Sequence, residues 1–262
     1  MGMGVRLGLG LTSGTPDFSL GSLQPAIWLK HDDITDVGSG KVDPWNDKTT
    51  NGNDADQSTD ANRPIFTSDY DRGVDAVVFD TTDVMTVTQS SSLNGDGVSM
   101  SLMGVVDGDP QSSFLFIFRK WAGSGDGWYF QNDGNNDAAI TIKTNAGAAS
   151  TTISPRPPLF NGGVHSFILI LDNGSYTFYL DGVSYATGSY TATGGFDNSS
   201  NMTIFDRVNG GGREFAIVNR VITANEITQA NNYFEDTYKI NYRVDDNGDY
   251  RVTSDGDYRM RA

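Results

Sequence analysis

The sequence predicts an all-β fold: an antiparallel two-sheet jelly-roll sandwich with one C-terminal helix, at about 224–238, and a terminal β-meander. Short apolar stretches alternate with clusters of Asp, Asn, Gly and Ser along the 262 residues, as strands alternate with turns. Of 33 acidic residues, only Glu214, Glu226 and Glu235 are glutamates. Aspartate together with 31 glycines is typical of turns, whereas a helical protein would contain more glutamate and lysine.

Five apolar stretches have the length and the aromatic or β-branched content of strands. They are Ala76–Phe79, Phe114–Phe118, Trp128–Phe130, Val164–Leu171 and Tyr176–Leu180. Phe114–Phe118 is apolar throughout, which predicts a strand buried on both faces. Phe167–Leu171 and Tyr176–Leu180 predict a hairpin with a four-residue loop, and Asp181-Gly182 begins the next turn.

One segment has helical spacing. Thr223 and Glu226 form an S/T-x-x-E capping box, in which two side chains satisfy two amides at a helix start. The residues that follow at helical spacing are Ile227, Ala230, Asn231, Phe234 and Tyr238. The sequence therefore predicts a helix at about 224–238.

The first 20 residues predict an N-terminal arm that precedes the sandwich at 21–240. Val5, Leu7, Leu9 and Leu11 alternate with other residues, mostly glycine, which is strand periodicity and not the continuous apolar core of a secretory signal. No apolar stretch approaches the roughly 18–20 residues that cross a bilayer. We expect neither membrane insertion nor secretion by the general route.

The last 22 residues, 241–262, form a repeat with a period of eight. Its repeating units are Tyr242-Arg243-Val244, Tyr250-Arg251-Val252 and Tyr258-Arg259-Met260. Asn247-Gly248 and Asp255-Gly256 are strong two-residue hairpin turns, so the tail is predicted to be a three-stranded meander. Turns of two residues would pair Val244 with Arg251 and mix apolar and charged residues on each face.

Six strings in chain order resemble the laminin G-like branch of the concanavalin A-like superfamily. They are Ala26–Lys30 with Asp32 and Asp33, Trp45-Asn46-Asp47 with Asn51–Ala55, Arg63–Phe66, Ala76–Asp80, Tyr179–Val183, and Phe215–Thr223 leading into the helix. The resemblance spans about 26–240 and implies a jelly-roll fold. Lys48-Thr49-Thr50 departs from the family's usual Leu-Ser-Gly, and the two ends lie outside the pattern. These ends resemble accessory segments of bacteriophage virion proteins.

Composition excludes several classes of site. A formal net charge of −15 repels phosphate, so we expect no nucleic-acid partner. There is no cysteine, and the two histidines, His31 and His165, lie outside any paired metal spacing. His165 heads an apolar strand, where we expect a hydrogen-bonded structural histidine.

We expect no catalytic residues. Glycan hydrolases of the resembled superfamily place two glutamates and an aspartate at alternate positions of one strand, and a carboxylate pair is what that chemistry needs. This sequence contains no Glu-x-Asp-x-x-Glu string; Glu226 is used by the cap, and Glu235 is expected on an exposed helix face.

We expect no cofactor. Calcium is the ion to consider, because the resembled domains sometimes hold it with hard oxygen ligands. However, Asp245, Asp246, Asn247 and Asp249 lack the twelve-residue loop and its distal glutamate, so a plain turn is the better interpretation.

Trp121, Asp126, Trp128 and Tyr129 are the candidate ligand-binding residues, since sugar binding needs aromatic platforms beside polar groups. The competing interpretation is that Trp128 and Phe130 face the core as alternate strand residues. The candidate assembly contacts lie in the two ends, at Leu7, Leu9, Leu11, Tyr242, Arg243, Tyr250, Arg251, Tyr258 and Arg259.

Together these features predict a non-enzymatic virion structural protein, for capsid decoration or a tail fibre. Its partners would be other virion proteins, further copies of itself and a host surface glycan. The first alternative is a carbohydrate-binding, lectin-like module of a bacterial surface or secreted protein, in an extracellular or cell-surface location. The second is a glycoside hydrolase with an aspartate-based site.

Overall fold

The structure is a computed structural model of the whole chain. It describes residues 18–71, 73–94, 99–108, 114–121, 127–133, 140–144, 151–155, 157–190, 199–238, 240, 242–244, 250–253 and 257–258. The strands of the body are β1 (Ile27–Asp36), β2 (Val42–Asp47), β3 (Ala55–Asp56), β4 (Ile65–Asp71), β5 (Val74–Phe79), β6 (Met85–Val87), β7 (Ser99–Gly108), β8 (Phe114–Trp121), β9 (Gly127–Asp133), β10 (Ile140–Thr144), β11 (Thr151–Thr152), β12 (Val164–Asp172), β13 (Ser175–Leu180), β14 (Val183–Ser189), β15 (Met202–Asp206) and β16 (Gly210–Val218). One α-helix, α1 (Ala224–Tyr238), follows them, and short 3-10 turns lie at Leu20–Leu23, Asp60–Asn62 and Ser91–Leu93.

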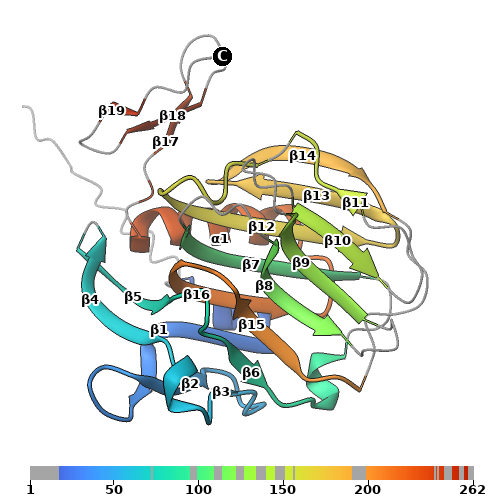
Figure 1. Cartoon of the computed structure of the whole chain (residues 1–262). Coiled ribbons are helices and arrows are strands. Elements are labelled where there is room, and N and C mark those ends of the chain that lie inside the picture. Colours follow the sequence, from blue (N-terminus) through green and yellow to red (C-terminus); the bar gives the residue numbers. More distant parts are fainter. Residues whose placement is uncertain are drawn as a thin grey trace, which may run out of the picture.

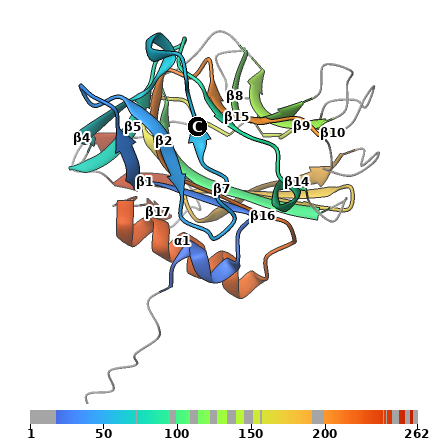
Figure 2. The same cartoon turned by 90° about the horizontal axis from the view of Figure 1, so that it is seen from below.

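Two stacked layers of antiparallel strands make up the body, which confirms the predicted sandwich (Figure 1). Hydrogen bonds run continuously in the order β11-β10-β9-β8-β15-β6-β3-β2-β1-β16-β7-β12-β13-β14. In Figure 2 the strands β8, β9, β10 and β15 lie in one layer, β1, β7, β14 and β16 lie in the other, and α1 lies beneath the second layer. The two layers therefore belong to one hydrogen-bonded sheet, which continues from the first layer to the second through β6, β3 and β2.

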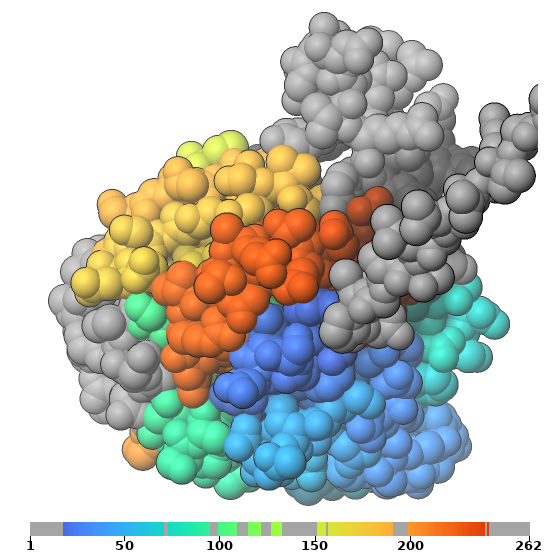
Figure 3. Space-filling view, turned by 180° about the vertical axis from the view of Figure 1, so that it is seen from behind, coloured from blue at the N-terminus to red at the C-terminus, as the bar shows by residue number. Residues whose placement is uncertain are grey.

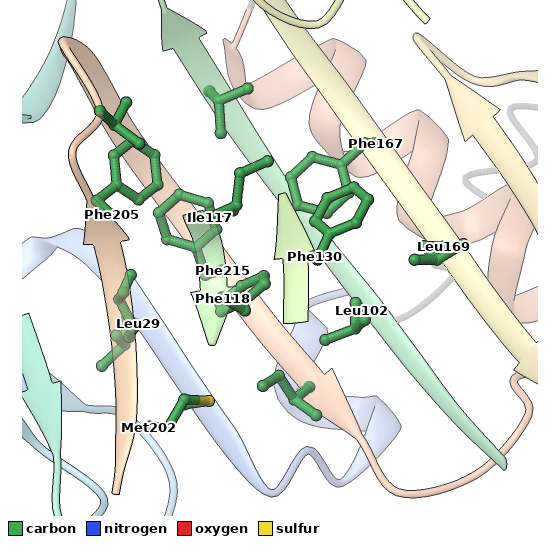
Figure 4. Packing of buried hydrophobic residues seen from close by; sticks show 14 of the residues in the cluster. Leu29, Leu102, Ile117, Phe118, Phe130, Phe167, Leu169, Met202, Phe205 and Phe215 are labelled. Carbon is green, nitrogen blue, oxygen red and sulfur yellow. The ribbon is translucent and has the colours of Figure 1, made fainter. Parts of the chain in front are cut away.

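Two apolar clusters hold these layers together. The larger one lies between the sheets; it includes Trp45, Phe130, Phe167 and Phe215, all at most 1% exposed. Figure 4 shows Phe130 of β9 beside Phe167 of β12, and their ring centroids are 5.2 Å apart. Burying several aromatic rings in this way contributes roughly 1.5–3 kcal/mol for each ring.

The second cluster lies between α1 and the outer side of the second sheet. The helical residues buried there are those that the spacing predicted: Ile227, Ala230, Asn231, Phe234 and Tyr238. Seen from behind, α1 crosses the surface between the strands β12–β14 and the N-terminal strands (Figure 3).

The capping box at the start of α1 is also confirmed. The Thr223 amide donates to Glu226 Oε2 at 2.7 Å, and the Glu226 amide donates to Thr223 Oγ1 at 3.3 Å. Arg220 adds two donors to the same carboxylate, at 2.9 and 2.7 Å, and so holds the helix start to the end of β16.

The hairpin between β12 and β13 has a two-residue turn, so the four-residue loop expected from the sequence is wrong. Asp172 pairs with Ser175, which leaves Asn173 and Gly174 in the turn at φ 42° and 93°. Both central residues of a type I′ turn require positive φ, which Asn and Gly tolerate. Asp181 and Gly182 form the next turn in the same way, at φ 47° and 80°.

The terminal repeat forms the predicted three-stranded meander, a sheet of its own made of β17 (Tyr242–Val244), β18 (Tyr250–Thr253) and β19 (Asp257–Tyr258). The predicted pairing is wrong by one residue, because Val244 pairs with Tyr250 and not with Arg251. Residues 245–249, between these two strands in the sequence, lie outside the described residues. The register places Tyr242, Val252 and Tyr258 directly opposite one another across the three strands.

Candidate binding face on strands β8 and β9

A β-bulge in β8 decides which of its side chains leave the core. Phe116 pairs with Gln131 and Phe118 pairs with Phe130, so β8 has one extra residue between these pairs. Leu115, Ile117 and Phe118 all belong to the core between the sheets. A bulge shifts the alternation of side chains along a strand. Arg119 and Trp121 therefore lie on the same outer side of the sheet as Phe116. Phe116 is thus half-buried, and the prediction of a strand buried on both faces is wrong at this residue.

Three aromatic rings form a continuous strip on this outer side. The Tyr129 ring of β9 lies between those of Phe116 and Trp121, with centroid separations of 5.5 Å to each. The interplanar angles are 82° to Phe116 and 55° to Trp121, which are geometries that aromatic pairs prefer over a face-to-face stack. All three residues have intermediate exposure, so they offer apolar surface to solvent while their rings hold one another in place.

Charged side chains border the strip along β8 and β15. The Arg119 guanidinium carbon lies 4.9 Å above the Phe116 ring, and Arg119 Nη1 pairs with Asp206 Oδ2 at 3.2 Å. Strand register explains this meeting, because Asp206 lies opposite Phe116 and Tyr129 lies opposite Arg119. Arg207 Nε lies 3.8 Å from the other oxygen of Asp206.

The backbone around Asp206 is in a conformation that side chains usually avoid. Phe205 has φ 56° and Arg207 has φ 66°, both in the left-handed region. The Phe205 ring is nevertheless fully buried, with its centroid 4.8 Å from that of Phe79. Such residues cost about 1–3 kcal/mol each and persist only where their surroundings enforce them. Here the core contact of Phe205 fixes the turn that presents Asp206 and Arg207 beside the strip.

Gly127 positions the start of β9. It pairs with Trp121 and has φ 143°, and a Cβ at this residue would lie 2.1 Å from the Lys120 carbonyl oxygen. Only glycine permits this close approach. The approach brings Tyr129 into register with Arg119.

Two of the four predicted ligand-binding residues, Trp121 and Tyr129, do come together. Trp128 is 2% exposed and belongs to the core, because strand alternation turns it inward, as it does Phe130; the competing interpretation, that these two residues face the core, is confirmed. Asp126 lies outside the described residues. Phe116, Arg119 and Asp206 could not be predicted from the sequence, since the bulge and the pairing of β15 with β8 have no sequence signal of their own.

The Tyr129 hydroxyl remains protonated near neutral pH. Partial burial raises its pKa above the ordinary value of tyrosine, and the positive charge of Arg119 opposes that shift. A protonated phenol can both donate and accept a hydrogen bond, which suits a surface that recognises hydroxyl groups.

The glutamates that a hydrolase would need occupy structural positions. Glu214 is fully buried between β16 and α1, where the Trp28 indole and the hydroxyls of Tyr233 and Tyr238 donate to its carboxylate. Burial raises the pKa of Glu214, and the hydrogen bonds oppose that shift. Glu226 caps α1, while Glu235 is partly exposed on the helix.

His165 is the hydrogen-bonded structural histidine that its position predicted. Its two ring nitrogens lie 2.7 Å from Asp181 Oδ2 and 2.9 Å from Asn161 Oδ1, and the residue is 5% exposed. Among the residues that the structure describes, no group of three or more acidic, histidine or cysteine side chains could hold a metal ion. In the same part of the chain, no helix is long and apolar enough to cross a membrane.

The predicted assembly residues lie mostly beyond this description. Leu7, Leu9, Leu11 and Arg259 lie outside the described residues. For Tyr242, Arg243, Tyr250, Arg251 and Tyr258, the structure gives only the backbone pairing reported above. Their role in assembly stays a prediction.

Comparison with protein families gives one match. The model described as the concanavalin A-like lectin/glucanases superfamily, in its laminin G form, matches residues 79–228. This segment contains β8, β9 and β15, and therefore the aromatic strip and its charged border. No curated protein sequence matches the chain.

Solved structures share the fold at low sequence identity. The binding domain of Paraclostridial Mosquitocidal Protein 1 has a TM-score of 0.62 at 12% identity, over 81% of this chain and 53% of that one. The binding domain of Botulinum neurotoxin serotype D, in complex with N-acetylneuraminic acid, has a TM-score of 0.55 at 10% identity, over 80% and 51%. This chain thus spans about half the length of these toxin domains.

A shorter relative matches over nearly its whole length. Domain 4 of AbnA, an extracellular arabinanase from Geobacillus stearothermophilus in complex with arabinotriose, has a TM-score of 0.52 at 13% identity, over 78% of this chain and 96% of that one. At these identities the similarity establishes the fold alone.

Proposed function

Because this chain belongs to the concanavalin A-like lectin/glucanases superfamily, we propose that it is a non-enzymatic carbohydrate-binding module that binds glycans on the outer face of β8 and β9. The observation that carries the proposal is the strip of Phe116, Tyr129 and Trp121, bordered by Arg119 and Asp206. Glycan sites need apolar rings beside a few placed polar groups, and this face has both.

Two structures of the same fold hold sugars, which supports the choice of ligand class. One is the arabinanase domain with arabinotriose, and the other is the neurotoxin binding domain with N-acetylneuraminic acid. The support from this chain itself is chemical. Sugar rings have apolar C–H faces that pack on aromatic rings, while their hydroxyls need the donors and acceptors that Arg119, Asp206 and Tyr129 offer.

The test is a glycan array followed by calorimetric titration of the best ligands. Trp121→Ala and Tyr129→Ala should each weaken binding by about 10-fold or more, since aromatic anchors dominate recognition energies. Phe18→Ala is the matched control, because Phe18 is also half-buried but packs against Tyr233 on the helix side. Wild-type affinity in both strip variants would contradict the proposed face.

Absence of catalysis is part of the proposal. Glu214 is enclosed by three donors and Glu226 is held by Arg220, so neither is placed to attack or protonate a glycosidic bond. Purified protein should release no reducing sugar from β-glucans, marine galactans or bacterial surface polysaccharide. A rate abolished by one Asp→Asn substitution would support the aspartate-based hydrolase instead.

A second candidate is a structural role in a virion, with the sandwich displayed outward and the ends attached to the particle. The observation in its favour is that the terminal repeat folds into its own sheet, β17–β19, separate from the sheet system of the body. Mass spectrometry of purified particles from the source would test it. In a virion, as in the alternative extracellular or cell-surface location, the strip would face host glycans.

A further inference from the structure

The charged border of the strip is not neutral. Among the described residues on this face, the guanidiniums of Arg119 and Arg207 share one carboxylate, that of Asp206. Among the described side chains of this face, two positive charges therefore stand against one negative charge, in a chain whose formal net charge is −15. A local positive charge against such a background indicates a ligand of the opposite sign.

Both guanidiniums can reach a ligand. The Arg207 side chain is 61% exposed and that of Arg119 is 37% exposed, whereas that of Asp206 is only 22% exposed. The 3.8 Å separation between Arg207 and Asp206 exceeds hydrogen-bond distance, so this contact does not fix the Arg207 guanidinium. Asp206 therefore anchors Arg119, while Arg207 can turn toward a second carboxylate.

Resting on the proposed glycan-binding face, we infer that the strip recognises an acidic sugar. The aromatic strip holds the apolar sides of the sugar rings, and a carboxylate at the Phe116 end of the strip, where Asp206 pairs with Phe116, is bound by Arg207 with help from Arg119. Guanidinium and carboxylate are both planar and form two parallel hydrogen bonds, which adds specificity to the charge attraction. A neutral sugar would leave the excess charge unmatched.

The net charge of the whole chain limits the kind of acid. At physiological salt, charges separated by more than about 8 Å are largely screened, so the arginines dominate at contact distance. A polyanion would extend beyond the arginines over the acidic surface and be repelled by it. The inferred ligand is therefore an oligosaccharide with one or a few carboxylates.

The experiment compares each acid with its own methyl ester. The probes are a glucuronic-acid-bearing oligosaccharide, a short oligogalacturonate and a sialylated oligosaccharide, each titrated beside its esterified form. Wild-type protein should bind at least one acid about 10-fold more tightly than its ester, the value of one charged hydrogen-bonded contact.

Two variants should shift that preference in opposite directions. Arg207→Gln should bring the ratio of acid to ester affinity close to one, and Asp206→Asn should raise it, because it removes the competing carboxylate. Lys41→Gln is the charge-matched control and should leave the ratio unchanged, since Lys41 pairs with the exposed Asp60 away from the strip.

Equal affinity for acid and ester, with binding lost in Trp121→Ala and Tyr129→Ala, would overturn the acidic ligand and leave the proposed binding face standing. An acid preference that survives Arg207→Gln and is insensitive to Asp206→Asn would also overturn it. If no carbohydrate binds wild-type protein, the proposed function fails together with this inference.

Discussion

Trp128 and Tyr129 are consecutive residues of β9 whose side chains lie on opposite sides of the sheet. Trp128 is 2% exposed in the core between the sheets, whereas the Tyr129 ring packs against Trp121 and Phe116 on the outer side. Strand alternation thus separates a structural aromatic from a candidate binding aromatic by one position. This separation makes binding and stability independently testable.

Substituting each of these two residues by alanine should affect a different property. Trp128→Ala should lower the free energy of unfolding by about 3–5 kcal/mol, because it leaves a large cavity in the core. Tyr129→Ala should lower the free energy of unfolding by only about 1 kcal/mol, the value of an aromatic contact at the surface, yet it should weaken glycan binding. Urea unfolding measures the first quantity and titration with the array-selected glycan measures the second. Equal stability losses in the two variants would mean that Tyr129 is also a core residue.

Burial of Glu214 should make stability depend on pH. Its folded pKa is raised above that of an unfolded glutamate, so the folded state favours the protonated form. The stability that this group contributes is complete below the unfolded pKa and is lost as pH rises through the folded pKa. Relative to Glu214→Gln, wild-type protein should therefore become progressively less stable as the pH is raised from about 4, the pKa of an unfolded glutamate, toward neutral.

Urea unfolding of both proteins at half-unit pH steps would measure this difference. Glu235→Gln is a suitable control, because Glu235 is partly exposed on the same helix. A stability difference between wild type and Glu214→Gln that stays constant over this range would show that the hydrogen bonds from Trp28, Tyr233 and Tyr238 cancel the effect of burial.

Glu226 should have the opposite pH dependence. Arg220 and the Thr223 cap lower its pKa to about 2, so its contribution is complete above the unfolded pKa and is lost as pH falls toward 2. Glu226→Gln should lower the free energy of unfolding by about 1 kcal/mol at pH 7, the usual value of a helix cap. Below pH 4 the decrease should become progressively smaller. Thermal unfolding of both proteins at pH 7 and pH 3 would show this. If the stability difference between wild type and Glu226→Gln does not decline on acidification, the loss would come from the changed shape of the side chain and not from its charge.

Much of the body could be predicted from its local patterns. Strand alternation, the Asp181-Gly182 turn and the Thr223 capping box act between neighbouring residues, so they leave a readable sequence signal. The face of β8 could not be predicted, because the bulge at Ile117 inserts one residue and redirects every side chain after it. Arg119 therefore meets Tyr129 and Asp206 only through the pairing of strands far apart in the sequence.

The predicted register of the terminal repeat was wrong for a related reason. Asn247-Gly248 favours a two-residue turn, which would pair Val244 with Arg251, yet Val244 pairs with Tyr250, one position away. That single shift places Tyr242, Val252 and Tyr258 directly opposite one another, where the predicted register pairs apolar with charged residues. A turn motif alone does not determine which loop length a hairpin adopts.

Deleting residues 241–262 should separate folding from assembly. The strands β17–β19 pair with one another and with none of the described strands of the body, whereas Ile240 is 1% exposed beside α1 and must be kept. We expect the deletion to lower the free energy of unfolding by less than about 1 kcal/mol. The Tm should therefore stay within roughly 4 °C of that of the full chain. Since three short strands are marginal alone, we expect the tail to pack against another copy or a virion protein. Light scattering should then show that the full chain self-associates, or binds its particle, while the truncated chain stays monomeric. Unfolding of the truncated chain would instead place the tail in the core of the domain and refute its role in assembly.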